Sequence, residues 1–140
     1  MAYEHTEVAV VKSQQKIREM IMKHQGFGIA FVSERDPAGD FDSSEGFQAK
    51  VMIDGKPYAV KVMAKVRKVK DVDQEERRIW RVLYHHMKSV FEASDSGVME
   101  FREIMLPYMM RADGKTVAQV ILPQIDKSIA TNRMLTSGDN

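Results

Sequence analysis

Residues 47–63 read FQAKVMIDGKPYAVKVM and carry the strongest structural signal in the chain. Apolar side chains recur at every second position on both sides of Asp54-Gly55. This dipeptide is the preferred pair for a two-residue type I′ turn, so the segment predicts a β-hairpin. Because a period of two gives each strand one apolar face, that face of the sheet must be covered by other elements.

The residues before the hairpin begin with a helical pattern. Ser13 is a favourable N-cap residue, and Ile17, Met20 and Ile21 follow it at helical spacing. Gly26 stands where a left-handed C-terminal cap belongs. We therefore predict a helix that begins at Ser13 and ends before Gly26.

A strand, a loop and a long helix are predicted around this core. Residues 27–32 alternate with period two, which indicates a strand, and residues 33–46 form a polar loop. Residues 65–73 read as a linker that either extends the preceding strand through Val66 or is solvated, and Asp73 is the expected N-cap of the long helix. The apolar stripe of that helix consists of Ile79, Leu83, Met87, Val90 and Phe91.

Two shorter helical patterns, in residues 98–105 and 116–125, complete the chain. The predicted fold class is α+β, with an N-terminal helix, a three-stranded antiparallel meander, and two or three C-terminal helices packed on one face of the sheet. A length of 140 residues is ordinary for one domain. We predict a single domain at 13–127 between a flexible N-terminus at 1–12 and a flexible tail at 128–140.

The composition favours a reducing, aqueous compartment. The chain has no cysteine, which fits a reducing environment, and no apolar run approaches the roughly 18 residues of a transmembrane helix. Residues 1–7 contain acidic residues and no basic ones, unlike a secretory or transit peptide. We therefore expect a cytoplasmic protein without a membrane partner.

No set of residues predicts catalysis. His85 and His86 are adjacent on a helix, so their side chains point about 100° apart and do not bind one metal from one face. The acidic residues of 34–45 lack EF-hand spacing, and no phosphate-loop or nucleophile motif occurs. A metal-dependent nuclease is a weak alternative, because Gln48-Ala49-Lys50 only partly matches its acid-x-Lys pattern. We expect no enzyme, no cofactor and no metal site.

The charge is polarised along the chain although its net value is only +1. Among the charged residues of 34–45, five are acidic and one is basic, whereas among those of 65–81 seven are basic and four are acidic. Arginines beside exposed aromatic rings suit single-stranded nucleic acid, because cations bind phosphates and rings stack on bases. The alternative is a solvated basic helix with Trp80 in the core. The candidate nucleic-acid-binding residues are Lys65, Arg67, Lys68, Lys70, Arg77, Arg78, Trp80, Arg81, Tyr84 and Lys88.

Several short motifs occur in a characteristic order between Ser13 and Gln124. They are Ser13-x-x-Lys16-Ile17-x-x-Met20-Ile21-x-Lys23, Asp54-Gly55, Arg78-Ile79-Trp80-Arg81, Phe91-Glu92-Ala93, Ser96-Gly97, Phe101-Arg102-Glu103, Leu106-Pro107-Tyr108 and Asp113-Gly114-Lys115-Thr116-Val117. In this order the chain resembles a family of short bacteriophage and prophage proteins that has no established activity. The resemblance implies a phage-like origin, hence the host cytoplasm, and it transfers no catalytic residue.

These observations lead to one expected function and two alternatives. We expect a non-enzymatic nucleic-acid-binding accessory protein of a phage or mobile element, with single-stranded DNA or RNA favoured. The helix–three strands–helix order also resembles double-stranded RNA-binding domains and the core of single-strand annealing proteins, a likeness of fold that does not decide function. The first alternative is a protein-interaction module that inhibits a host factor, and the second is a self-assembling structural protein.

Overall fold

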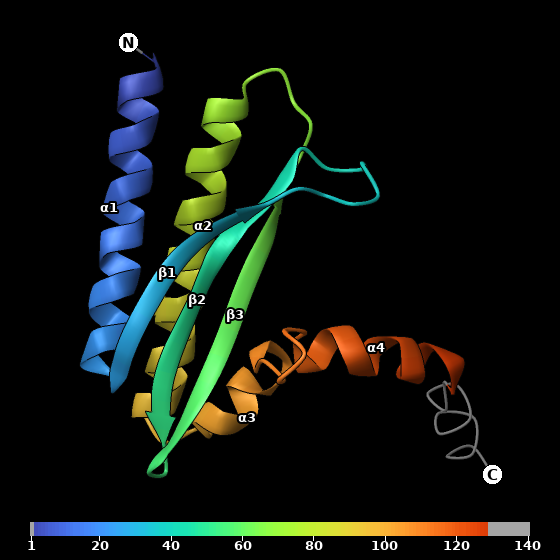
Figure 1. Ribbon diagram of the computed structural model, residues 1–140. Coiled ribbons are helices and arrows are strands. Elements are labelled where there is room, and N and C mark those ends of the chain that lie inside the picture. Colours follow the sequence, from blue (N-terminus) through green and yellow to red (C-terminus); the bar gives the residue numbers. More distant parts are fainter. Residues whose placement is uncertain (1, 129–140) are drawn as a thin grey trace, which may run out of the picture.

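The computed structural model describes residues 2–128, with side chains from residue 8 onward. It confirms the α+β prediction of a helix, a three-stranded antiparallel sheet and further helices (Figure 1). None of the helices within this range is long and apolar enough to cross a membrane. The elements are α1 (Ala2–Lys23), β1 (Gly26–Glu34), β2 (Ser43–Ile53), β3 (Lys56–Val66), α2 (Val72–Asp95), α3 (Phe101–Met105), the 3₁₀ turn η1 (Leu106–Tyr108) and α4 (Val117–Lys127).

The predicted hairpin is present, and it is longer than the alternating pattern suggests. Asp54 and Gly55 both have positive φ, 51° and 78°, as a type I′ turn requires. The ladder between β2 and β3 continues to the pair Ser43–Val66. β2 therefore begins in residues that the sequence assigned to a loop, because backbone pairing does not require alternating side chains, and β3 continues through Val66, as one of the two alternatives for residues 65–73 predicted.

Helices α1 and α2 lie side by side over one face of the sheet (Figure 1). Their apolar stripes meet the inward residues of the strands, as the one-faced pattern of the hairpin predicted. Ile17 and Phe47 have no exposed surface. The other most deeply buried side chains are Ile21, Val51, Val60, Val66, Trp80, Met87 and Met105.

Both ends of α1 differ from the prediction. The helix begins at Ala2, so residues 2–12 are helical where a flexible segment was expected, and Ser13 lies inside the helix. Val10 packs against the core, and this tertiary contact outweighs the local capping signal. At the other end Gln25, with φ of 67°, takes the left-handed conformation predicted for Gly26.

Gly26 has a different role from the predicted cap. A Cβ atom at this position would lie 2.4 Å from Ile21 Cγ2, so the start of β1 approaches α1 too closely for any side chain. The predicted tail, 128–140, starts at Ser128, which is the C-cap residue of α4, and residues 129–140 lie outside the described part of the chain. Helix α4 contacts η1 and extends away from the sheet (Figure 1).

Candidate nucleic-acid interface

A cavity of about 660 Å³ lies between the segment that leaves β3 and the first half of α2. We call it the basic pocket, because five cations and only two carboxylates line it, a net charge of +3. Helix α2 contributes positions spaced by three and four residues, which share one face. The lining residues are Arg67, Val69, Lys70, Asp71, Gln74, Glu75, Arg77, Arg78 and Arg81.

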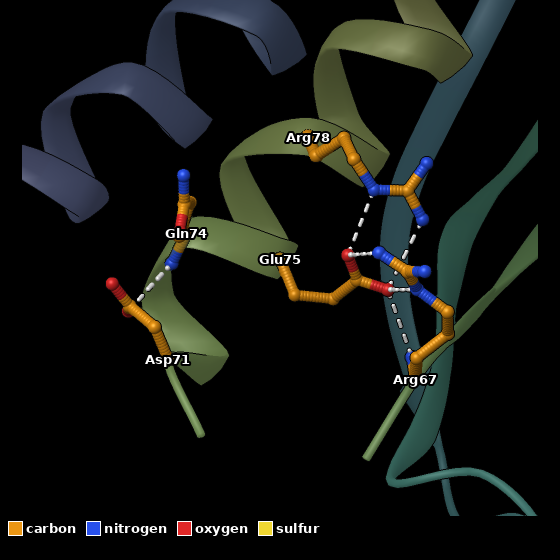
Figure 2. Close-up of polar contacts among 5 residues, drawn as sticks. All are labelled: Arg67, Asp71, Gln74, Glu75 and Arg78. Atoms are coloured by element: carbon orange, nitrogen blue, oxygen red, sulfur yellow. Dashed lines mark hydrogen bonds and ion pairs between the residues drawn. The ribbon is translucent and has the colours of Figure 1, made fainter. Parts of the chain in front are cut away.

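The carboxylate of Glu75 organises this pocket (Figure 2). Its side chain is only 2% exposed. Arg67 donates from Nε at 2.9 Å and from Nη2 at 3.1 Å, and its backbone N–H donates at 3.0 Å. Arg78 donates from Nε at 2.8 Å and from Nη2 at 3.1 Å. Five hydrogen bonds thus saturate the two oxygens of one carboxylate.

These contacts favour the ionised forms of all three residues. The hydrogen bonds from Arg78, and then those from Arg67, hold the pKa of Glu75 far below its ordinary value despite burial. The hydrogen bond to Glu75 raises the pKa of Arg67 and likewise that of Arg78. The pocket therefore keeps a fixed charge at neutral pH.

The N-terminus of α2 forms the rim of the pocket. Asp71 is the N-cap residue and accepts from the backbone N–H of Gln74 at 3.0 Å (Figure 2). The sequence placed the cap at Asp73, which instead lies inside the first turn. A cap two residues earlier adds about half a turn to the start of the helix, and Glu75 lies in the first turn, where it meets Arg67.

The basic pocket brings together half of the ten predicted site residues, namely Arg67, Lys70, Arg77, Arg78 and Arg81. Lys65 lies outside it, over the ring of Phe41 at 4.7 Å. Lys68 donates to the backbone carbonyl of Gly39, and Lys88 is exposed farther along α2. Tyr84 is half-buried, with the Nζ of Lys16 5.1 Å from its ring centroid.

Trp80 is not available for base stacking, which corrects its assignment to the interface. Its side chain is 1% exposed and lies edge-on to Phe31, with ring centroids 5.6 Å apart. Its Nε1 donates to Oε1 of Glu45 at 3.2 Å. Trp80 therefore anchors the core, as the alternative interpretation of this helix stated.

Sequence reasoning missed Glu75 as a member of the site. The pair Glu75 and Arg78, three residues apart, was a detectable signal because such residues are neighbours on a helix. The contact between Glu75 and Arg67 could not be predicted from helical spacing, because Arg67 lies in the irregular segment between β3 and α2. Val69 and Gln74 also line the pocket without having been predicted.

The acidic segment 34–45 is occupied by local contacts. Glu34 pairs with Lys61, and Asp36 accepts from the backbone N–H of Phe41 at 2.8 Å. Within the described residues, no group of three or more His, Cys, Asp or Glu side chains is placed to hold a metal ion.

Comparison with protein-family models, with curated proteins and with solved structures finds no match to this chain. A functional proposal must therefore rest on the residues of the chain itself.

Trp80 provides a fluorescence test of its burial, because it is the single tryptophan. In the native protein we expect weak quenching by acrylamide, and a shift of the emission to longer wavelength in guanidinium chloride, because unfolding exposes the indole to water. Free tryptophan is the control. Strong acrylamide quenching of the native protein would contradict the buried position.

The variant Glu75→Gln should be less stable than the native protein at pH 7, because two guanidinium groups then lack their counter-charge. An unfolded glutamate titrates near about pH 4.3, and the pKa of Glu75 is depressed in the folded state. Its contribution to stability is therefore fully present above about pH 5 and is lost as the pH falls below about 4. The difference in unfolding midpoint should shrink between pH 7 and pH 3, as measured by urea denaturation. A difference that is constant with pH would contradict this linkage.

Proposed function

We propose that this protein is a non-enzymatic nucleic-acid-binding accessory protein of a phage or mobile element, and that it contacts phosphate groups through the basic pocket. One observation carries the proposal. Five cations surround a single cavity with a net charge of +3, in a chain whose total charge is only +1. Such a local excess attracts polyanions although the whole molecule is nearly neutral.

Phosphate contacts are the mode of binding that this pocket supports. Its cations include four arginines, whose planar, multiply donating guanidinium groups match phosphate oxygens. The lining contains no aromatic side chain, and Trp80 is buried. Of the two rings expected to stack on bases, Trp80 is therefore unavailable, and the half-buried Tyr84 remains as the candidate for single-strand binding.

Binding should be steeply dependent on salt. If four of the five cations neutralise phosphates, the slope of log affinity against log salt is about −3.6, and the affinity falls by roughly 100-fold between about 50 and 200 mM salt. The double variant Arg77→Ala, Arg81→Ala should weaken binding and reduce that slope by about 2. Fluorescence anisotropy with labelled single- and double-stranded DNA and RNA measures both quantities.

A matched control removes two arginines outside the pocket. Arg102 lies on α3, and Arg111 lies near Asp113, with 3.7 Å between Nη2 and Oδ2. The double variant Arg102→Ala, Arg111→Ala changes the net charge equally and should keep the native slope. Equal losses in both double variants, or no binding at low salt, would contradict the proposal.

A second candidate function is self-association, which the surface of α4 favours. The side chains of Ile121, Leu122 and Ile125 are 40%, 55% and 52% exposed, and all three lie on this short helix. Helices of about this length are marginal in water without packing. Two copies related by a two-fold axis would bring the same apolar residues together.

This candidate predicts a concentration-dependent dimer in multi-angle light scattering. The double variant Leu122→Gln, Ile125→Gln should shift the protein to the monomer, and its far-UV circular dichroism should lose at most the helical signal of α4. The variant Lys127→Gln on the same helix is the control and should remain associated. A native protein that is monomeric at high concentration would reject self-association.

A further inference from the structure

The two arginines that hold Glu75 keep part of their donor capacity for a ligand. A guanidinium group carries five N–H donors, and Arg67 and Arg78 each use Nε and Nη2 on the carboxylate (Figure 2). Within the described residues, the Nη1 amino group of each has no hydrogen-bond acceptor. The side chains of Arg67 and Arg78 are 58% and 41% exposed, although the carboxylate between them is buried.

Glu75 also fixes these two groups before any ligand arrives. Ordering a long side chain on binding normally reduces affinity, whereas folding has already ordered both guanidinium groups here. The carboxylate lies between two cations that would otherwise repel each other, a repulsion that acts to lower the pKa of Arg78. Glu75 is therefore a positioning residue for a pair of arginines.

The cations of the basic pocket converge on one cavity. Arg67 and Lys70 approach it from the segment before α2, and Arg77 and Arg81 approach it from the helix. Arg77 and Arg81 are about 6 Å apart along the helix axis, and the next cation on α2, Lys88, is roughly 10 Å farther. The charge is concentrated at one place and is not spread along a strand-length track.

We infer that the basic pocket binds a terminal phosphomonoester of a nucleic acid, with Arg67 and Arg78 as its positioned donors; this inference rests on the proposed function. A phosphomonoester carries about −1.5 to −2 charge at pH 7 and three acceptor oxygens, more than an internal phosphodiester offers. It therefore gains more from convergent cations. The cavity, about 660 Å³, is within the range of about 300–1,000 Å³ of small-molecule sites, which suits a strand end.

The test uses oligonucleotides of one sequence that end in a 5′-phosphate, a 3′-phosphate or hydroxyls only. We expect anisotropy titrations to give at least about tenfold tighter binding for one phosphorylated end than for the hydroxyl ends, because hydrogen bonds to charged groups are strong. Inorganic phosphate, added as a competitor, should remove this preference and leave the weaker binding of hydroxyl-ended strands.

Conservative variants separate geometry from charge. Arg78→Lys keeps the charge but loses the planar, forked donor set. It should abolish the preference for the phosphorylated end, because the loss of affinity for that strand exceeds the loss for the hydroxyl-ended strand. Arg67→Lys should act in the same way, and Arg102→Lys, outside the pocket, should keep the native preference. Glu75→Gln should also lose the preference, provided that circular dichroism shows a folded protein.

The outcomes distinguish this inference from the function on which it rests. Salt-sensitive binding that is equal for phosphorylated and hydroxyl ends would overturn the terminal-phosphate site and leave nucleic-acid binding intact. A preference that survives both lysine variants would overturn the assigned donors. Absence of binding to every oligonucleotide would overturn the inference together with the proposed function.

Discussion

The buried carboxylate of Glu75 joins the end of the sheet to the start of α2, and the geometry of the basic pocket depends on it. A lone carboxylate in this position would be costly to bury. Five hydrogen bonds from Arg67 and Arg78 offset that cost. A buried ion pair does not by itself add net stability, but the hydrogen bonds to Glu75 fix the positions of two guanidinium groups.

The first turns of α2 carry two adjacent glutamates, Glu75 and Glu76, whose surroundings have opposite charge. Glu76 follows Glu75 in α2, yet its pKa is raised by burial and by the neighbouring carboxylates Glu45 and Asp73. Adjacent residues on a helix point about 100° apart. Glu75 therefore meets cations and Glu76 meets anions, and the charge polarisation seen along the sequence persists within a single turn of the structure.

Packing in the core explains why Trp80 is buried although it lies on the basic helix α2. Trp80 fills the space between α2 and the strands, and its indole N–H is satisfied by Glu45. A large ring with one polar atom stabilises a core well when that atom has a partner. The arginines around it remain outside, so that the basic face of α2 contacts anions by charge and hydrogen bonds and has no exposed indole.

The sequence by itself determined the elements whose signals are local. Asp54-Gly55 and the alternation around it predicted the hairpin, and the stripe from Ile79 to Phe91 predicted the buried face of α2. Helical spacing also predicted that the arginines of α2 share one face, since Arg77, Arg78 and Arg81 recur within about one turn and line one cavity.

Only the tertiary structure decided the rest, because the deciding contacts join residues that are distant in the chain. Trp80 and Glu45 are 35 residues apart, so no local pattern distinguished a buried indole from an exposed one. Arg67 and Glu75 meet across irregular backbone whose path depends on the helix cap at Asp71. Likewise, α1 continues N-terminal of Ser13, where Val10 packs against the core. Periodicity predicts which face a residue occupies, but packing decides what that face touches.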